Sequence, residues 1–179
     1  MSNSICYSGW YAGYTYPKAE RKVFREIELK GVEVFLPLCK VVRQWSDRKR
    51  KVEVPLFPSY VFVYATRNSL YELLRIRELV RIVSFEGKFC RIPDPQIESI
   101  RKLIEGNIPI QHEDFVPRVG SLVRVEHGPL KGVEGTIKEI KGKSRLIIQI
   151  LALGQAVSID ISKHHLKEVA REENVLIKA

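Results

Sequence analysis

The chain has 179 residues, of which 45% are hydrophobic and 28% are charged, and its formal net charge is +9. These values are typical of a globular protein of one or two domains, and the apolar runs are far shorter than the roughly 20 residues that span a bilayer. The composition therefore excludes a membrane protein, and the basic excess favours a polyanionic partner. The N-terminus MSNSICYSGWYAG lacks the pattern of a secretion signal, so we expect a cytoplasmic location.

No catalytic or metal-binding pattern stands out. The cysteines Cys6, Cys39 and Cys90 are widely spaced, as reduced thiols are, and they form no ligand cluster with the histidines. The sequence has no GxSxG, HExxH or glycine-rich phosphate loop, and its aspartates are scattered among turns and caps. We therefore expect no metal, no cofactor and no enzymatic activity.

The first part of the chain mixes strands and helices. The hydrophobic periods predict strands over residues 6–16, 32–44, 55–64, 81–85 and 88–92. They predict helices over residues 17–30, 69–77 and 94–105. The boundary signals are Pro17 and Gly31 for the first helix, a Ser69/Glu72 capping box for the second, and Asp94-Pro95 with Gly106 for the third. This pattern indicates an α+β domain in which helices cover one face of an antiparallel sheet.

A block of four consecutive basic residues precedes the strand predicted over 55–64. It consists of Arg48, Lys49, Arg50 and Lys51. Because like charges in a block repel one another and resist burial, we expect an exposed loop or hairpin tip. A solvated tip and a nucleic-acid contact are about equally compatible with this block, and phosphate attraction grows with the number of cations engaged.

The entry to that strand is irregular and aromatic. Pro55 and Pro58 cannot donate ladder hydrogen bonds, so regular pairing is expected to begin near Ser59. Phe57 and Tyr60 are either part of the core or an aromatic patch for a partner. We favour the patch, since two faces of a short strand are hard to bury in a small domain, and we expect that truncating both residues leaves the fold intact.

The second part of the chain has short strands separated by glycine turns. They are predicted over residues 121–127, 133–141, 145–151, 155–161 and 167–169, which suggests a small closed β-barrel. The segment GNIPIQHEDFVPRVG between the two parts resembles a linker. We therefore divide the chain into domains at 1–107 and 120–179, joined by a linker over 108–119.

Three segments together resemble the NusG family of transcription factors. They are Trp10-Tyr11 on the first strand, PLFPSYVFV at 55–63 and GPLKGVEGTI at 128–137, and they cover most of the chain in the family's order. The resemblance implies an NGN domain followed by an SH3-like KOW β-barrel. The form EVPLFPSYVFV at 53–63 is similar to specialised members of the family such as RfaH, LoaP and UpxY, which would imply antitermination of a long surface-polysaccharide operon.

What the resemblance implies about partners begins with RNA polymerase. The first domain would dock, as a monomer, on the clamp helices of the β′ subunit and reach toward the β lobe, and so suppress pausing and termination. The residues that match the family's contact are Phe57, Pro58 and Tyr60, with Trp10 and Tyr11 close to the same pocket.

The resemblance also implies contact with non-template DNA or nascent RNA. Arg77 matches a family arginine in an ungapped reading, whereas Lys18, Arg21, Lys22 and Arg25 depart from the family pattern. For Arg21 and Arg25, a solvated helix face is favoured over a nucleic-acid contact by about two to one. The basic block at 48–51 would lie close to the nucleic acid.

For the KOW barrel, the resemblance implies Rho or a small-subunit ribosomal protein as a partner. The turn residues Gly128, Pro129, Gly132 and Gly135 are expected to shape the backbone rather than to contact a partner. The β-branched strands predict a stable barrel that does not refold. The alternative function is a ribosome-associated or general RNA-binding KOW protein.

Overall fold

The computed structural model describes residues 8–44, 49–106, 110–113, 122–140, 143–161 and 166–168. Its first part is built on a five-stranded antiparallel sheet in the order β2-β5-β1-β6, with β9 also paired to β1. The strands are β1 (Gly9–Thr15), β2 (Glu33–Phe35), β5 (Tyr60–Ala65), β6 (Leu79–Ile82) and β9 (Arg91–Ile92). The chain is thus an α+β protein, as the sequence predicts.

Helices cover both faces of this sheet rather than one. Helices α1 (Glu20–Leu29) and α2 (Arg67–Leu73) share a core with Val61 and Val63, which are fully buried. Helix α3 (Asp94–Glu105) belongs to a second core with Trp10 and Phe62 on the opposite face. The prediction of a single covered face is therefore wrong, because the large aromatic side chains of the second face also require burial.

Two predicted elements have different boundaries. The strand expected over 32–44 is divided at the buried Pro37 into β2 and β3 (Leu38–Gln44). Helix α2 begins earlier than predicted because the side chain of Thr66, not Ser69, occupies the N-cap and accepts a hydrogen bond from the Ser69 amide at 3.3 Å. The turn expected at Glu86-Gly87 is confirmed by positive φ angles at both residues and connects β7 (Ser84–Phe85) to β8 (Lys88–Phe89).

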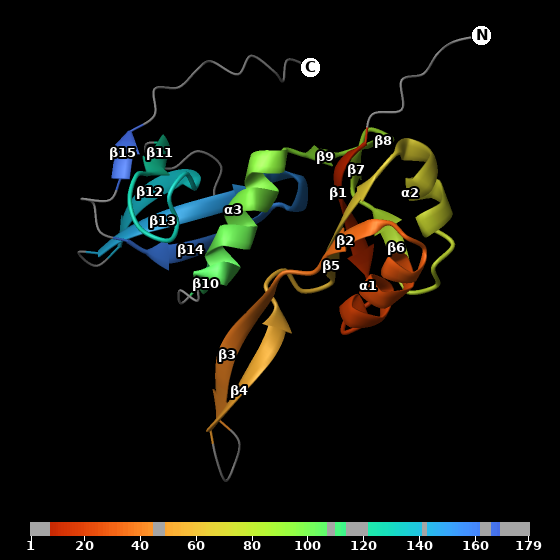
Figure 1. The fold of residues 1–179 in the computed structure, drawn as a ribbon, viewed down its shortest axis with the longest axis horizontal. Helices are drawn as coiled ribbons and strands as arrows, with labels where there is room; N and C mark the ends of the chain where they lie inside the picture. The colour runs from red at the N-terminus through yellow and green to blue at the C-terminus, as the bar shows by residue number, and fades with distance from the viewer. Residues whose placement is uncertain are drawn as a thin grey trace.

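The hairpin of β3 and β4 (Lys49–Pro55) is a two-stranded sheet of its own. It projects away from the two larger sheets (Figure 1). At its base the Leu56 amide donates to the Pro37 carbonyl at 2.7 Å. The basic block therefore lies largely on a strand: residues 49–51 belong to β4, whereas Arg48 lies outside the described residues.

The second part is a six-stranded antiparallel sheet in the order β10-β14-β13-β12-β11-β15. Its strands are β10 (Ile110–Glu113), β11 (Leu122–Val125), β12 (Glu134–Ile140), β13 (Lys143–Ile150), β14 (Gln155–Asp160) and β15 (Leu166–Glu168). A 3₁₀ turn, η1 (Leu151–Leu153), joins β13 to β14. Strand β10 falls within the predicted linker and pairs with β14, so part of that segment belongs to the second sheet.

The glycines of the second part have structural roles. Gly128 and Gly132 have φ angles of 86° and 85°, which are unfavourable for other residues. A Cβ on Gly135 would lie 2.4 Å from the carbonyl oxygen of Ile147 on the neighbouring strand. These positions therefore support the interpretation that the glycines shape the backbone.

The close approach at Gly135 leads to a stability prediction. We expect Gly135→Ala to lower the free energy of unfolding by about 1–3 kcal/mol, because β12 and β13 must separate to admit the methyl group. Urea denaturation of the purified chain measures this change. The exposed Lys131 provides a control, since Lys131→Ala should change stability by less than about 0.5 kcal/mol. Equal stability of the Gly135 variant and the wild type would contradict the role of the glycine.

Candidate functional site

The turn from Phe57 to Tyr60 separates a buried aromatic residue from exposed ones. Phe57 is fully buried, with its ring centroid 5.7 Å from that of Phe62 in an edge-on contact. Pro58 is exposed, and Ser59 and Tyr60 are half-buried. The interpretation of Phe57 as part of an exposed patch is therefore wrong, because its side chain fills the core that α3 covers, and we expect its truncation to destabilise the fold.

The solvent-accessible part of this site is formed by side chains from three neighbouring strands. Tyr60 on β5 contacts Tyr14 on β1, with ring centroids 5.3 Å apart and ring planes inclined at 62° to each other. The guanidinium of Arg81 on β6 lies 5.4 Å from the Tyr14 centroid, a cation–π contact. We call Pro58, Tyr60, Tyr14 and Arg81 the aromatic surface.

Tyr14 and Arg81 were absent from the residues predicted from the sequence. The signal that could have found Tyr14 is its spacing of two residues from Ala12 and four from Trp10, which places it on the aromatic face of β1. Arg81 is brought to Tyr14 by the pairing of β1 with β6, which the sequence pattern does not specify. Partial burial raises the pKa of the Tyr60 hydroxyl above its ordinary value, so this group is neutral near pH 7.

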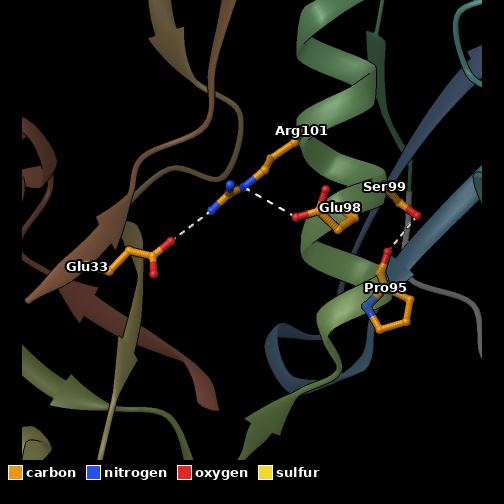
Figure 2. Close-up of polar contacts among 5 residues, drawn as sticks. All are labelled: Glu33, Pro95, Glu98, Ser99 and Arg101. Carbon is orange, nitrogen blue, oxygen red and sulfur yellow. Dashed lines mark hydrogen bonds and ion pairs between the residues drawn. The ribbon is translucent and has the colours of Figure 1, made fainter. Parts of the chain in front are cut away.

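Trp10 lies farther along the same face, beneath a cation–π contact with α3. Its side chain is 6% exposed, and the Arg101 guanidinium lies 5.4 Å from its ring centroid and 5.2 Å from that of Phe35. Figure 2 shows Arg101 reaching from α3 toward Glu33 on β2, at 3.2 Å, and Glu98 on its own helix, at 3.8 Å. Trp10 is therefore held within the contact between α3 and the sheet.

Tyr11 points to the other face of the sheet, away from Trp10, as expected for adjacent strand residues. Its ring lies 6.4 Å from that of Phe89, and Phe89 in turn lies 5.3 Å from Tyr71, which is exposed. The structure therefore places Tyr11 with a second aromatic group, apart from the aromatic surface.

Arg50 and Lys51 are exposed on β4 of the projecting hairpin. The strand register places Arg43 opposite Arg50. Nearer the base, Arg21 of α1 forms an ion pair with Glu53 at 3.7 Å. Among the described residues, the hairpin therefore presents Arg50 and Lys51 to solvent and has an ion pair with α1 near its base.

Of the other predicted nucleic-acid residues, Arg21 and Lys22 are paired with carboxylates. Lys22 pairs with Glu78 at 2.6 Å, and this contact raises the pKa of the lysine and lowers that of the carboxyl group. Arg77, Lys18 and Arg25 are exposed. The pairing of Arg21 and Lys22 with carboxylates favours the interpretation of the basic side of α1 as a solvated helix face.

Helix α3 also contacts the second sheet. The Lys102 ammonium donates a hydrogen bond of 2.8 Å to the carbonyl of Lys131, and α3 lies between the two larger sheets in Figure 1. A pocket of about 260 Å³ that opens to solvent lies beside this contact, with Ser99 of α3 and Thr136 of β12 among its lining residues. Core residues of both parts form one hydrophobic cluster.

Within the described parts of the chain, no three His, Cys, Asp or Glu side chains lie close enough together to hold a metal ion. No helix in those parts is long and apolar enough to span a membrane. The aromatic surface combines aromatic rings with the Arg81 cation, a composition that is enriched in protein interfaces.

The fold has a helix-covered sheet, a projecting basic hairpin and a second, small β-sheet unit. The sequence of its first part matches a known protein family. Residues 8–101 match the family described as "Transcription termination factor nusG". The chain therefore belongs to the NusG family of transcription termination and antitermination proteins.

Known NusG proteins are similar in sequence to this chain over most of its length. The termination/antitermination protein NusG of Pasteurella multocida is 32% identical over 177 residues, which cover 90% of this chain and 95% of that protein. The NusG protein of Vibrio vulnificus is 28% identical over 166 residues, covering 85% of this chain and 91% of the relative. A solved structure titled "Domain interaction in Thermotoga maritima NusG" covers 92% of this chain and 98% of its own, with 21% identity and a TM-score of 0.49.

Proposed function

We propose that the protein is a transcription elongation and antitermination factor that binds RNA polymerase through its first domain and suppresses pausing and termination. The observation that carries this proposal is the aromatic surface, where Pro58 is exposed and Tyr60 and Tyr14 are partly exposed beside a cation. Aromatic residues and arginine are enriched at the centres of protein interfaces. A helical, partly acidic partner such as the polymerase clamp would suit this surface.

This docking surface differs from the set of residues predicted at first. Pro58 and Tyr60 remain candidates for direct contact, whereas Phe57 and Trp10 support the surface from within the core. Tyr11 lies on the opposite face of the sheet, where it would suit a second contact toward the β lobe. The first domain would then contact the polymerase on two sides, as a monomer.

The nucleic-acid contact is assigned to the β3–β4 hairpin. Its exposed Arg50 and Lys51 would lie along the phosphates of non-template DNA or nascent RNA. Arg77 is a second candidate because it is exposed. The paired Lys22 and Arg21 would contribute less, since their carboxylate partners reduce the charge presented to a phosphate.

The specialised role that we propose is antitermination of a long surface-polysaccharide operon by a cytoplasmic protein. The support for this role is the segment EVPLFPSYVFV described above. The second unit, as a KOW domain that does not refold, would recruit Rho or a small-subunit ribosomal protein. The second candidate function is that of a ribosome-associated or general RNA-binding protein. The exposed cations of the hairpin would be sufficient for such RNA binding. The aromatic surface favours the polymerase instead.

The experiment is transcription by the cognate purified RNA polymerase on a long template with pause sites and a terminator. Wild-type protein should increase run-through and co-elute with polymerase. A Pro58→Ala/Tyr60→Ala variant should lose at least about tenfold in affinity, the scale of one strong interface residue, and should lose the run-through effect. An exposed pair on and just after α2, Arg67→Ala/Arg75→Ala, serves as the control. If the wild type neither co-elutes with polymerase nor increases run-through, the ribosome-associated class becomes the better description of the function.

A further inference from the structure

The turn that presents Pro58 and Tyr60 contains a strained residue. The Tyr60 amide donates to the Phe57 carbonyl at 3.2 Å, which closes a four-residue turn with Pro58 at its second position and Ser59 at its third. Ser59 has a φ of 64°, in the left-handed region. Proline at the second position with positive φ at the third is characteristic of type II turns, where the third residue is usually glycine. The chain therefore adopts at Ser59 a conformation that serine disfavours.

Two hydrogen bonds hold Ser59 in this conformation. The carboxylate of Glu20 accepts from the Ser59 amide at 2.7 Å, and the Ser59 carbonyl accepts from the Thr15 amide at 2.8 Å. The second bond anchors the turn to the end of β1. The first bond connects the turn to α1, 39 residues earlier in the chain.

Glu20 is unusual for a carboxylate because it is only 6% exposed. Burial of a charged group costs free energy unless hydrogen bonds compensate for it, so the bond from Ser59 matters to both partners. The position of Glu20 in the first turn of α1 is also favourable, because the helix N-terminus stabilises negative charge. The carboxylate is therefore held in place to receive the Ser59 amide.

We propose that Glu20 is a positioning residue for the polymerase contact: it stabilises the left-handed Ser59 and so fixes the direction in which Pro58 and Tyr60 face the partner. This inference rests on the proposed function. In the absence of the Glu20 oxygen, Ser59 would relax toward negative φ, and Pro58 and Tyr60 would no longer be presented together.

Glycine substitution separates this role from a general loss of stability. Glu20→Ala should weaken polymerase binding about tenfold, the factor expected for releasing one residue from the left-handed region. Adding Ser59→Gly should restore most of the affinity, because glycine adopts positive φ without the carboxylate. Glu20→Gln, which keeps an accepting oxygen, should stay within about threefold of the wild type. Glu28→Ala, on the exposed side of the same helix, is the matched control and should change nothing.

A second measurement reports on the turn without polymerase. Hydrogen exchange of the Ser59 amide, followed by NMR in the full chain, should be about tenfold faster or more in Glu20→Ala than in the wild type. Faster exchange with no polymerase binding by the wild type would support the positioning role and contradict the proposed function. Unchanged exchange in Glu20→Ala would overturn the positioning role, and so would a loss of binding that Ser59→Gly fails to restore. If Glu20→Ala does not fold, Ser59→Val in the intact chain tests the same point, since a β-branched residue should lose the left-handed turn and the binding together.

Discussion

Truncation of Phe57 to alanine is expected to lower the free energy of unfolding of the chain by about 3–5 kcal/mol. The side chain is fully buried, stacks edge-on against Phe62, and belongs to the core that also contains Trp10 and the apolar residues of α3. The cavity left by the missing ring would be bounded by residues on two sheets and a helix that cannot easily collapse into it. A loss of this size is a large fraction of the stability of an ordinary domain.

Urea denaturation monitored by tryptophan fluorescence measures this effect, because Trp10 lies in the same core. Phe85→Ala provides a matched control: the same ring is removed from a position that is 66% exposed, and the change should be below about 0.5 kcal/mol. Similar stabilities for the two variants would show that Phe57 leaves the core in solution and would return it to the direct docking surface. The prediction also explains why Tyr60 and Pro58, rather than Phe57, are the residues to vary in polymerase-binding experiments.

Removal of two positive charges from the β3–β4 hairpin is expected to reduce the salt dependence of nucleic-acid binding. For Arg50→Gln/Lys51→Gln, the negative slope of log K against log salt should become shallower by about 1.8 for duplex DNA, or by about 1.4 for a single strand, if both side chains neutralise phosphates. The affinity at low salt should fall by about tenfold to a hundredfold. Both side chains are exposed on β4, so the substitutions remove charge without opening a cavity.

A control with the same change of net charge distinguishes contact from general attraction. Arg67 and Arg75 are exposed on and just after α2, outside the hairpin, and Arg67→Gln/Arg75→Gln lowers the net charge by the same amount. Titration of fluorescently labelled DNA and RNA at several salt concentrations gives the slopes for both variants. Equal slopes for the hairpin variant and the wild type would mean that the hairpin tip is merely solvated.

Local sequence patterns predicted most of the secondary structure correctly, because those patterns depend on neighbouring residues. The left-handed Gly31 after α1 and the Glu86-Gly87 turn both appear as predicted. The boundaries failed where a nearby residue competed for the same role. Thr66 replaced Ser69 as the cap of α2, and Pro37 divided a predicted strand.

The sequence by itself determined the α+β class, the basic bias, the turn chemistry around Pro58 and the segments that resemble the NusG family. Only the tertiary structure decided which aromatic residues face solvent. Phe57 and Tyr60 are three positions apart, yet one is fully buried and the other is partly exposed beside Tyr14 and Arg81. The bond from Ser59 to Glu20 was likewise invisible, because it joins residues 39 positions apart. Periodicity describes the faces of one element, whereas exposure depends on which other elements pack against each face.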